Sequence, residues 1–230
     1  MAEERIAERI DANLLDVTME DLHDMPKQLY EGKISKLREK TQGQLVIKEY
    51  PTASAHSGHF KSLMNELALK KSFRPDVIFI DYLNICASSR FKGGNISSYF
   101  YVKAIAEELR GLAVEFNVPI FSATQTTRTG YVSTDIGLED TSESFGLPAT
   151  ADFMFALISN EELEALGQMK VKQLKNRYND PSINRAFIIG VDRSKMRLYD
   201  VQQKAQEIVD ANQVDEKEDA YNKFSDFKLW

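Results

Sequence analysis

Four consecutive apolar residues, Val77 to Ile80, run directly into the carboxylate of Asp81, and a polar segment follows at once. An apolar run without alternation is typical of a strand that is covered on both faces in a parallel sheet. In such sheets ligands bind beyond the carboxyl ends of the strands, which is where Asp81 would emerge. A carboxylate there can hold Mg²⁺ beside a nucleotide phosphate, as in the second (Walker B) motif of P-loop NTPases, or it can simply cap the next turn.

Helical and strand signals alternate along the rest of the chain, which predicts an α/β protein with a mostly parallel sheet flanked by helices. Thr18 and Asp21 have the spacing of a capping box for a short helix, and Pro26 is suited to begin the helix that follows. Apolar residues at helical spacing place the longer helices around residues 6–14, 29–37, 60–67 and 101–116, with Leu29, Ile34 and Leu37 facing inward. Besides the 77–81 strand, strands are expected within residues 44–50, 118–125, 152–159, 170–180, 184–192 and 195–200, the last two as a hairpin or meander.

Charge and cysteine content narrow the classes of protein to which the chain can belong. The formal net charge of −6 provides no overall basic surface, so any nucleic-acid contact must come from local loops. The single cysteine, Cys86, excludes an intramolecular disulfide and favours a reducing, cytoplasmic compartment, which for a viral protein is the host cytoplasm. No apolar run approaches the length that a membrane helix needs, so no membrane association is expected.

Four segments with polar residues at or near strand ends carry a resemblance to one known family. They are DVIFIDYLNI (76–85), FSATQTTR (121–128), EDTSES with ATADFMFAL (139–144 and 149–157) and LKNRYND (174–180). In this order and spacing, over nearly all of residues 1–200, the chain resembles the hexameric replicative helicases of the DnaB type, most closely those of T-even-like bacteriophages. The resemblance implies a RecA-like motor domain over residues 1–204 with a C-terminal antiparallel extension. Residues 205–230 would form an acidic, aromatic-containing tail.

The resemblance also implies roles for four residues at the strand ends. Asp81 would coordinate Mg²⁺ through water, and Gln125 would sense the γ-phosphate and couple it to the DNA-binding loops. Lys175 and Arg177 would reach across a subunit boundary to the nucleotide of the neighbour, and their spacing of two places them on the same side of a strand. Gln125 could instead satisfy backbone groups of its own loop, and Lys175 and Arg177 could form a solvated strand edge.

Two loops, residues 86–98 and 128–146, would face the central channel of the ring and hold the backbone of single-stranded DNA. The second loop departs from the family pattern, because Ser142 stands where an arginine is usual, which shifts the expected grip toward backbone amides and Ser144. An ordinary flexible surface loop is the alternative for residues 86–98. The expected DNA-binding residues are Arg90, Lys92, Gly93, Gly94, Arg128, Glu143 and Ser144.

A phosphate-binding P-loop is missing from the sequence. No G-x-x-x-x-G-K-[ST] string occurs, and the nearest imitation, SGHFKS (57–62), has Lys61 three residues after a lone glycine, Gly58. In the family, residues 1–16 match the helix just after the catalytic glutamate, so that glutamate and the P-loop would lie upstream of Met1. We therefore expect the C-terminal part of a helicase motor that is inactive as an ATPase on its own.

The function implied by the resemblance is that of a replicative 5'–3' DNA helicase, which couples ATP hydrolysis at subunit interfaces to translocation on single-stranded DNA. Its cofactors would be ATP, or another nucleoside triphosphate, and Mg²⁺. Its partners would be single-stranded DNA, further copies in a homo-hexamer, primase and a helicase loader. Two alternatives stay open: a RecA-type recombination or repair ATPase, and a non-catalytic fragment that binds DNA or blocks ring assembly.

Overall fold

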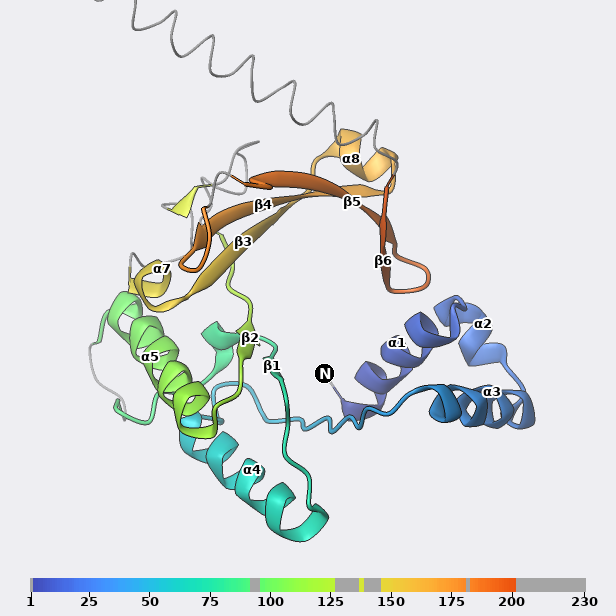
Figure 1. The fold of residues 1–230 in the computed structure, drawn as a ribbon, viewed down its shortest axis with the longest axis horizontal. Coiled ribbons are helices and arrows are strands. Elements are labelled where there is room, and N and C mark those ends of the chain that lie inside the picture. Colours follow the sequence, from blue (N-terminus) through green and yellow to red (C-terminus); the bar gives the residue numbers. More distant parts are fainter. Residues whose placement is uncertain (1, 92–95, 127–136, 139–145, 181–182, 202–230) are drawn as a thin grey trace, which may run out of the picture. The chain divides into compact units, whose positions relative to one another are not determined.

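The computed structural model describes residues 2–91, 96–126, 137–138, 146–180 and 183–201 (Figure 1). The chain divides into two compact units, one of residues 50–156 and 173–183 and the other of residues 1–49, 157–172 and 184–230. The expected tail, residues 205–230, lies outside the described residues. Of the helices in the described part of the chain, none offers an apolar stretch long enough to cross a lipid bilayer.

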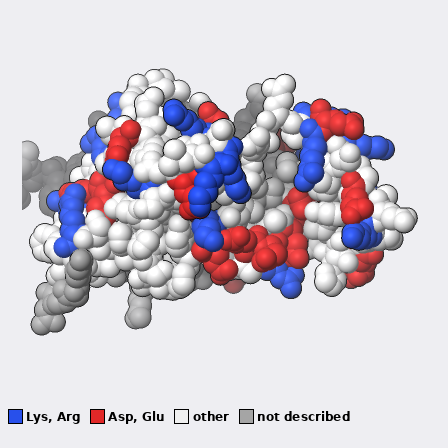
Figure 2. All heavy atoms as spheres, turned by 90° about the horizontal axis from the view of Figure 1, so that it is seen from below, with Lys and Arg blue, Asp and Glu red and all other residues white. Residues whose placement is uncertain are grey.

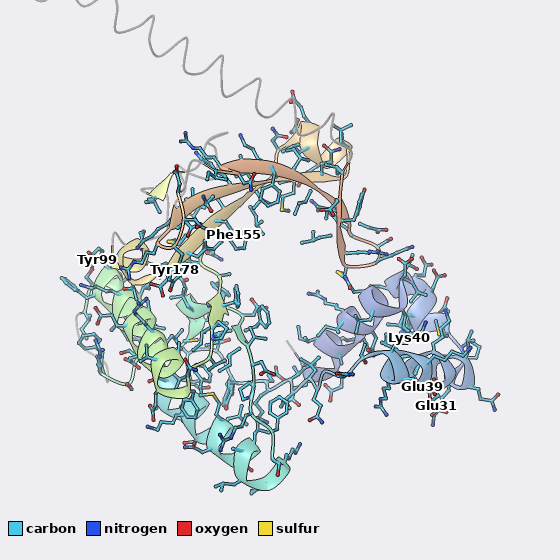
Figure 3. All side chains as sticks on the ribbon, viewed as in Figure 1. Glu31, Glu39, Lys40, Tyr99, Phe155 and Tyr178 are labelled. Carbon is cyan, nitrogen blue, oxygen red and sulfur yellow. The ribbon has the colours of Figure 1, made fainter. Side chains whose placement is uncertain are left out.

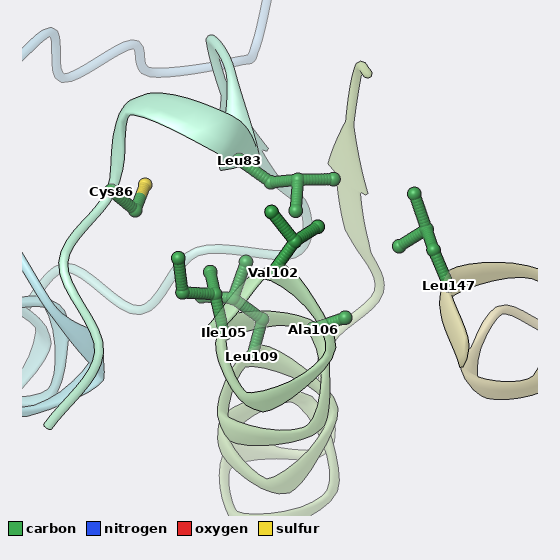
Figure 4. Packing of buried hydrophobic residues seen from close by; sticks show 7 residues of the cluster. All are labelled: Leu83, Cys86, Val102, Ile105, Ala106, Leu109 and Leu147. Atoms are coloured by element: carbon green, nitrogen blue, oxygen red, sulfur yellow. The ribbon is translucent and has the colours of Figure 1, made fainter. Parts of the chain in front are cut away.

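The unit of residues 50–156 and 173–183 is organised around the long helix α5 (Ser98–Phe116), as its apolar spacing predicts. Ile105 of α5 is only 1% exposed and lies in a cluster of buried apolar side chains (Figure 4). The short helices η1 (Leu83–Ile85) and α7 (Gly146–Thr150) contribute Leu83 and Leu147 to the same cluster. Helix α4 (Ser57–Lys71) packs beside α5 (Figure 1).

Strands β1 (Ile78–Ile80) and β2 (Ile120–Ser122) form a parallel pair in the same unit. Ile78 lies opposite Ile120, and Ile80 lies opposite Ser122. Ile80 packs against the apolar cluster beneath α5, so this helix covers one face of the pair. The parallel pairing that the apolar run before Asp81 predicts is therefore confirmed.

The other face of this strand pair is exposed, which corrects the expectation of burial on both faces. Phe79 is 73% exposed and Phe121 is 49% exposed, and their rings stack with centroids 5.3 Å apart. Successive strand residues point to opposite faces, so Phe79 points away from the face that Ile80 places against α5. A continuous apolar run does not by itself indicate how many of its faces are covered.

The N-terminal part of the second unit consists of three helices, α1 (Glu3–Leu15), α2 (Met19–Asp24) and α3 (Lys27–Lys40). The side-chain hydroxyl of Thr18 accepts a hydrogen bond from the Asp21 amide at 3.0 Å, so the expected cap of α2 is confirmed. Helix α3 begins directly after Pro26, also as predicted. In α3, whose residues are all described, no side chain is buried, and Leu29 is 52% exposed, so its expected inward orientation is wrong. Glu31, Glu39 and Lys40 project from this helix (Figure 3).

Strands β3 to β6 form a four-stranded sheet in sequence order, and the boundary between the two units falls within β3 and β4. Strand β4 pairs antiparallel with β5, and β5 pairs antiparallel with β6, which confirms the antiparallel extension and the closing hairpin. The short helix α8 (Glu161–Ala165) precedes β4, and the Asn160 side chain caps it. The strands span Phe153–Ile158 (β3), Gln168–Asn176 (β4), Ala186–Asp192 (β5) and Arg197–Asp200 (β6).

The end of α1 is tied to the turn between β5 and β6 within the same unit. The carboxylate of Asp16 pairs with Lys195 at 3.2 Å and with Arg197 at 2.8 Å. The Met19 amide donates to the Ser194 carbonyl at 2.9 Å. The Lys195 and Arg197 hydrogen bonds lower the pKa of Asp16, so the carboxylate stays ionised and keeps both pairs near neutral pH.

The expected strand at residues 44–50 does not form, although all of these residues are described. Leu45 is 64% exposed, and the Glu49 amide donates to the side chain of Glu3 at 2.9 Å. An apolar, β-branched segment becomes a strand only where a neighbouring backbone supplies ladder partners. The composition of residues 44–50 indicates an extended conformation and does not reveal whether such a neighbour is present.

Replacing Ile105 by alanine should lower the free energy of unfolding by about 2–5 kcal/mol, because the deleted methyl groups leave a cavity in a close-packed cluster. Urea unfolding of the 230-residue chain followed by circular dichroism measures this loss. The control is Leu69→Ala on α4, where the side chain is 86% exposed and the expected change is within about 0.5 kcal/mol. Equal losses for the two variants would contradict the packing of α5 described here.

Candidate functional site

The ends of the parallel strands bring Asp81 and Gln125 to one edge of the sheet. Asp81 follows the last residue of β1, and Ser122 at the end of β2 donates its hydroxyl to the Ile80 carbonyl at 2.8 Å. The amide nitrogen Nε2 of Gln125 donates to the hydroxyl of Tyr82, the residue after Asp81, at 3.3 Å. Both Asp81 and Gln125 are exposed. The sheet edge therefore presents a carboxylate and an amide that can contact a ligand from solvent.

Lys175 and Arg177 lie at the end of β4 and both reach the carbonyl oxygens of α7. The Lys175 ammonium donates to the Pro148 carbonyl, and Nη2 of Arg177 donates to the Ala149 carbonyl at 2.9 Å. Burial and the nearby Arg177 charge lower the pKa of Lys175. Tyr178, which follows Arg177, is 76% exposed (Figure 3). Two cations thus converge on the C-terminal end of one short helix, a location that favours positive charge.

Asp152 completes this group and was missed by the reasoning from sequence. Its carboxylate oxygen Oδ1 accepts from Nη1 of Arg177 at 3.0 Å, and Oδ2 accepts from Nη1 of Arg110 at 2.7 Å. The Arg110 hydrogen bond, helped by the Arg177 charge, lowers the pKa of Asp152 and keeps it ionised. The Arg177 amide also donates to the Asp152 carbonyl at 3.0 Å. Asp152 therefore fixes Arg177 through both its side chain and its backbone, in an arrangement called here the Asp152 clamp.

Of the first expected DNA-binding loop, residues 86–91 and 96–98 are described. Nη1 of Arg90 pairs with the Glu107 carboxylate at 2.5 Å, and Lys103 lies 3.8 Å from the same carboxylate. Lys and Arg side chains lie beside Asp and Glu side chains on the face that Figure 2 draws. The structure thus describes Arg90 among the expected DNA-binding residues, in an ion pair with an acid of α5. The other expected residues lie outside the described part of the chain: Lys92, Gly93, Gly94, Arg128, Glu143 and Ser144.

In the segment that most resembles a P-loop, residues 57–62, the Gly58 amide and the Lys61 side chain already bind other groups of the chain. The Gly58 amide donates to Nδ1 of His56 at 3.0 Å, and the His56 amide donates to Nδ1 of His59 at 3.3 Å, which together cap α4. A side chain at Gly58 would meet His56 at 2.8 Å, so the turn is closed by the imidazole. Lys61 pairs with Glu115 of α5. A P-loop uses free amides and a free lysine for phosphates, so this segment does not serve as one.

The residues present fit part of a nucleotide site. The exposed carboxylate of Asp81 suits a Mg²⁺ ion held through water, which usually needs one or two carboxylates together with substrate phosphates. Among the described residues, no group of three His, Cys, Asp or Glu side chains could enclose a metal ion by itself. Asp81 would therefore hold Mg²⁺ only together with water and a bound phosphate.

Comparison with known proteins identifies the relatives of this chain. The family model for the DnaB-like helicase C-terminal domain matches residues 1–194. The chain is 43% identical over 231 aligned positions to a DnaB-like replicative helicase of Enterobacteria phage T4, covering 97% of this chain and 49% of that protein. It is 35% identical over 133 positions to a probable plasmid replicative DNA helicase of Chlamydia trachomatis, covering 56% of this chain and 27% of that protein. The chain spans about half or less of the length of these curated relatives.

Solved structures support the same fold. One solved ATPase domain superposes with a TM-score of 0.70 at 16% identity, covering 88% of this chain and 72% of that one. A DnaB-like replicative helicase, whose structure was described with its interactions with primase, gives a TM-score of 0.69 at 16% identity, covering 88% and 49%. At this identity the likeness concerns the fold alone, and the family assignment rests on the matching domain model and the T4 relative. This chain belongs to the DnaB-like helicase C-terminal domain family.

Proposed function

We propose that this chain is the C-terminal part of the motor of a replicative DNA helicase, which couples ATP hydrolysis at subunit interfaces to 5'–3' movement along single-stranded DNA. The observation that carries the proposal is the sheet edge where Asp81 and Gln125 emerge from neighbouring parallel strands, with Gln125 bonded to Tyr82 at 3.3 Å. Ligands of parallel α/β sheets bind at such edges. The family membership supplies the reaction class for a site of this kind.

In this proposal each residue of the edge has one task. Asp81 orients the water ligands of Mg²⁺, which supplies charge neutralisation at the phosphates when it is bound. Gln125 contacts the γ-phosphate, and its bond to Tyr82 links that contact to the segment leading into residues 86–91. Lys175 and Arg177 serve the nucleotide of a neighbouring subunit, so catalysis needs a ring. The proposed cofactors are ATP, or another nucleoside triphosphate, and Mg²⁺.

The proposed partners follow from the same assembly. Further copies of the chain form a homo-hexamer. Loops 86–98 and 128–146 of each copy hold single-stranded DNA in the central channel of this hexamer. Primase is supported as a partner by the structural neighbour that was described with primase interactions. A helicase loader is proposed by family analogy alone.

A non-catalytic fragment remains the second candidate, because the sequence carries no P-loop string and residues 57–62 are closed by capping and ion pairing. Such a fragment would bind DNA or occupy ring interfaces without turnover. The two candidates share the DNA-binding loops and differ in whether the assembled ring hydrolyses ATP.

Arg90→Ala and Lys92→Ala in the complete helicase should each weaken single-stranded DNA binding and reduce the slope of log K against log salt by about 1. Each variant loses one phosphate contact, so its binding to DNA releases fewer counterions. Fluorescence anisotropy with a labelled oligonucleotide over a salt series measures both quantities. Lys70→Ala on α4 removes the same charge from an exposed pair with Glu66 and is the matched control. If the two loop variants behave like Lys70→Ala, the loop does not contact DNA and the proposed channel role is wrong.

A further inference from the structure

Two adjacent carboxylates of α5, Glu107 and Glu108, contact the beginning of the first expected DNA-binding loop in different ways. Glu108 accepts hydrogen bonds from the hydroxyl of Ser88 and from the hydroxyl and amide of Ser89, whereas Glu107 binds the guanidinium of Arg90. Neither residue belongs to the strand ends that make up the proposed nucleotide site. The pair lies instead where the helix that carries the apolar cluster meets the loop.

The Glu108 carboxylate accepts hydrogen bonds from the loop and from the first turn of α4. The hydroxyl of Ser88 donates to Oε1 at 2.6 Å, and the hydroxyl and amide of Ser89 donate to Oε2 at 2.7 and 3.0 Å. The hydroxyl of Ser57, in the first turn of α4, donates to Oε2 at 2.8 Å. The Arg90 amide lies 3.4 Å from Oε1. One carboxylate thus joins α5, the start of α4 and the first residues of the loop.

The electrostatics agree with an anchor that is ionised near neutral pH. Burial alone would raise the pKa of Glu108, but the hydrogen bonds from Ser88, Ser89 and Ser57 outweigh it and lower that pKa to about 2. Ser88 is only 5% exposed, and its amide donates to the Tyr101 hydroxyl at 3.1 Å. The residue before it is also fixed, because the Ala87 amide donates to the Ala55 carbonyl at 2.7 Å. The base of the loop is therefore held rigidly up to Ser89.

Glu107 makes a weaker and more accessible contact. The side chains of Arg90 and Glu107 are 51% and 37% exposed, and Lys103 shares the same carboxylate. Ion pairs at such exposure contribute little to stability, so a phosphate that approaches Arg90 can displace Glu107. The two carboxylates therefore have different roles: Glu108 holds the backbone of the loop, and Glu107 is paired with the Arg90 side chain.

We propose that Glu108 is a positioning residue that fixes the base of the DNA-binding loop, and that Glu107 competes with the DNA phosphate for Arg90. This inference rests on the proposed function of the loop. Glu108 fixes the position of the backbone from which the Arg90 side chain extends. Glu107 keeps Arg90 in an ion pair until a nucleic-acid phosphate replaces the carboxylate. Removing either carboxylate changes the charge by the same amount, yet the two removals act on DNA binding in opposite directions.

Amide hydrogen exchange of this chain without DNA tests the anchor. Glu108→Gln should accelerate exchange of the Ser89 amide on the order of tenfold, because a strong charge-assisted acceptor is replaced by a neutral one. Glu107→Gln is the matched control and should leave this amide unchanged, since Glu107 binds only side chains here. Ser57→Ala keeps the carboxylate and the loop sequence and should give a smaller acceleration in the same direction. Unchanged exchange in Glu108→Gln overturns the anchor.

Single-stranded DNA binding by the complete helicase tests the competition. Glu107→Gln should raise affinity severalfold, and Glu108→Gln should lower it on the order of tenfold despite the identical change in charge. Equal increases in both variants would mean that Glu108 acts only as a negative charge, and the positioning role would be overturned. If exchange accelerates as expected but Arg90→Ala, Glu107→Gln and Glu108→Gln all leave affinity unchanged, the loop does not bind DNA. That result removes the proposed DNA contact and this inference with it, whereas unchanged exchange removes the anchor alone.

Discussion

Arg177→Ala in the complete helicase is expected to spare nucleotide binding and to lower ATP turnover by about 10³-fold or more, the scale of arginine-finger losses. The reason is that, in the proposed ring, the Arg177 guanidinium of one subunit would stabilise transition-state charge on the nucleotide of the next. Lys175→Ala should act in the same direction but more mildly, because an ammonium offers a point charge where guanidinium offers a planar fork. Steady-state turnover together with an equilibrium nucleotide-binding measurement separates the two effects.

Subunit mixing decides whether Arg177 acts in trans. Arg177→Ala subunits and subunits with an inactivated P-loop should each be inactive alone, and mixed rings should regain part of the activity. Restoration follows from geometry, since one kind of interface in a mixed ring joins an intact P-loop to an intact arginine. If rings that demonstrably exchange subunits regain nothing, Arg177 acts within its own subunit or only holds the end of β4 against α7, where it bonds the Ala149 carbonyl.

The 230-residue chain on its own is expected to show no ATP hydrolysis above background and at most weak nucleotide binding. The phosphates would lack a cradle of free amides, because the Gly58 amide caps α4 through His56 and Lys61 pairs with Glu115. A phosphate-release assay, with an intact DnaB-type helicase as positive control and single-stranded DNA present, checks this. Turnover comparable to that of the intact helicase would show that another segment cradles the phosphates.

Much of the fold could be predicted from local signals. Thr18 caps α2, Pro26 precedes α3, the stripe through Ile105 forms the buried face of α5, and the last two strands pair as a hairpin. Each of these follows from chemistry within a few residues of the position. Three expectations failed for a common reason: the strand at residues 44–50, the burial of Phe79 and the inward orientation of Leu29. In each case the sequence indicates an apolar segment, but whether another element covers it or supplies its ladder partners depends on distant parts of the chain.

Part of the candidate site could likewise be predicted from local signals, and part of it depends on residues far apart in the sequence. The position of Asp81 and Gln125 at one sheet edge follows from two parallel strands, which their apolar runs predict. The Asp152 clamp could not be predicted, because Arg110 and Arg177 lie 42 and 25 positions from Asp152 and nothing in their local sequence links them. Glu108 was missed for the same reason, since its partners Ser57 and Ser88 precede it by 51 and 20 positions. The one local signal for this group was that Asp152 itself stands at the start of a predicted strand, residues 152–159.

The Asp152 clamp has a consequence for how quickly Arg177 could engage a neighbour. A free arginine side chain carries about 2 kcal/mol of rotamer entropy, which it must give up when it binds a phosphate. With Oδ1 of Asp152 and the Ala149 carbonyl already holding the guanidinium, Arg177 has surrendered much of that freedom in advance. Because Arg110 donates to the other carboxylate oxygen, Oδ1 of Asp152 would be expected to keep its position when Arg177 leaves. Arg177 would then exchange one set of ordered partners for another in each cycle, starting every time from the same conformation.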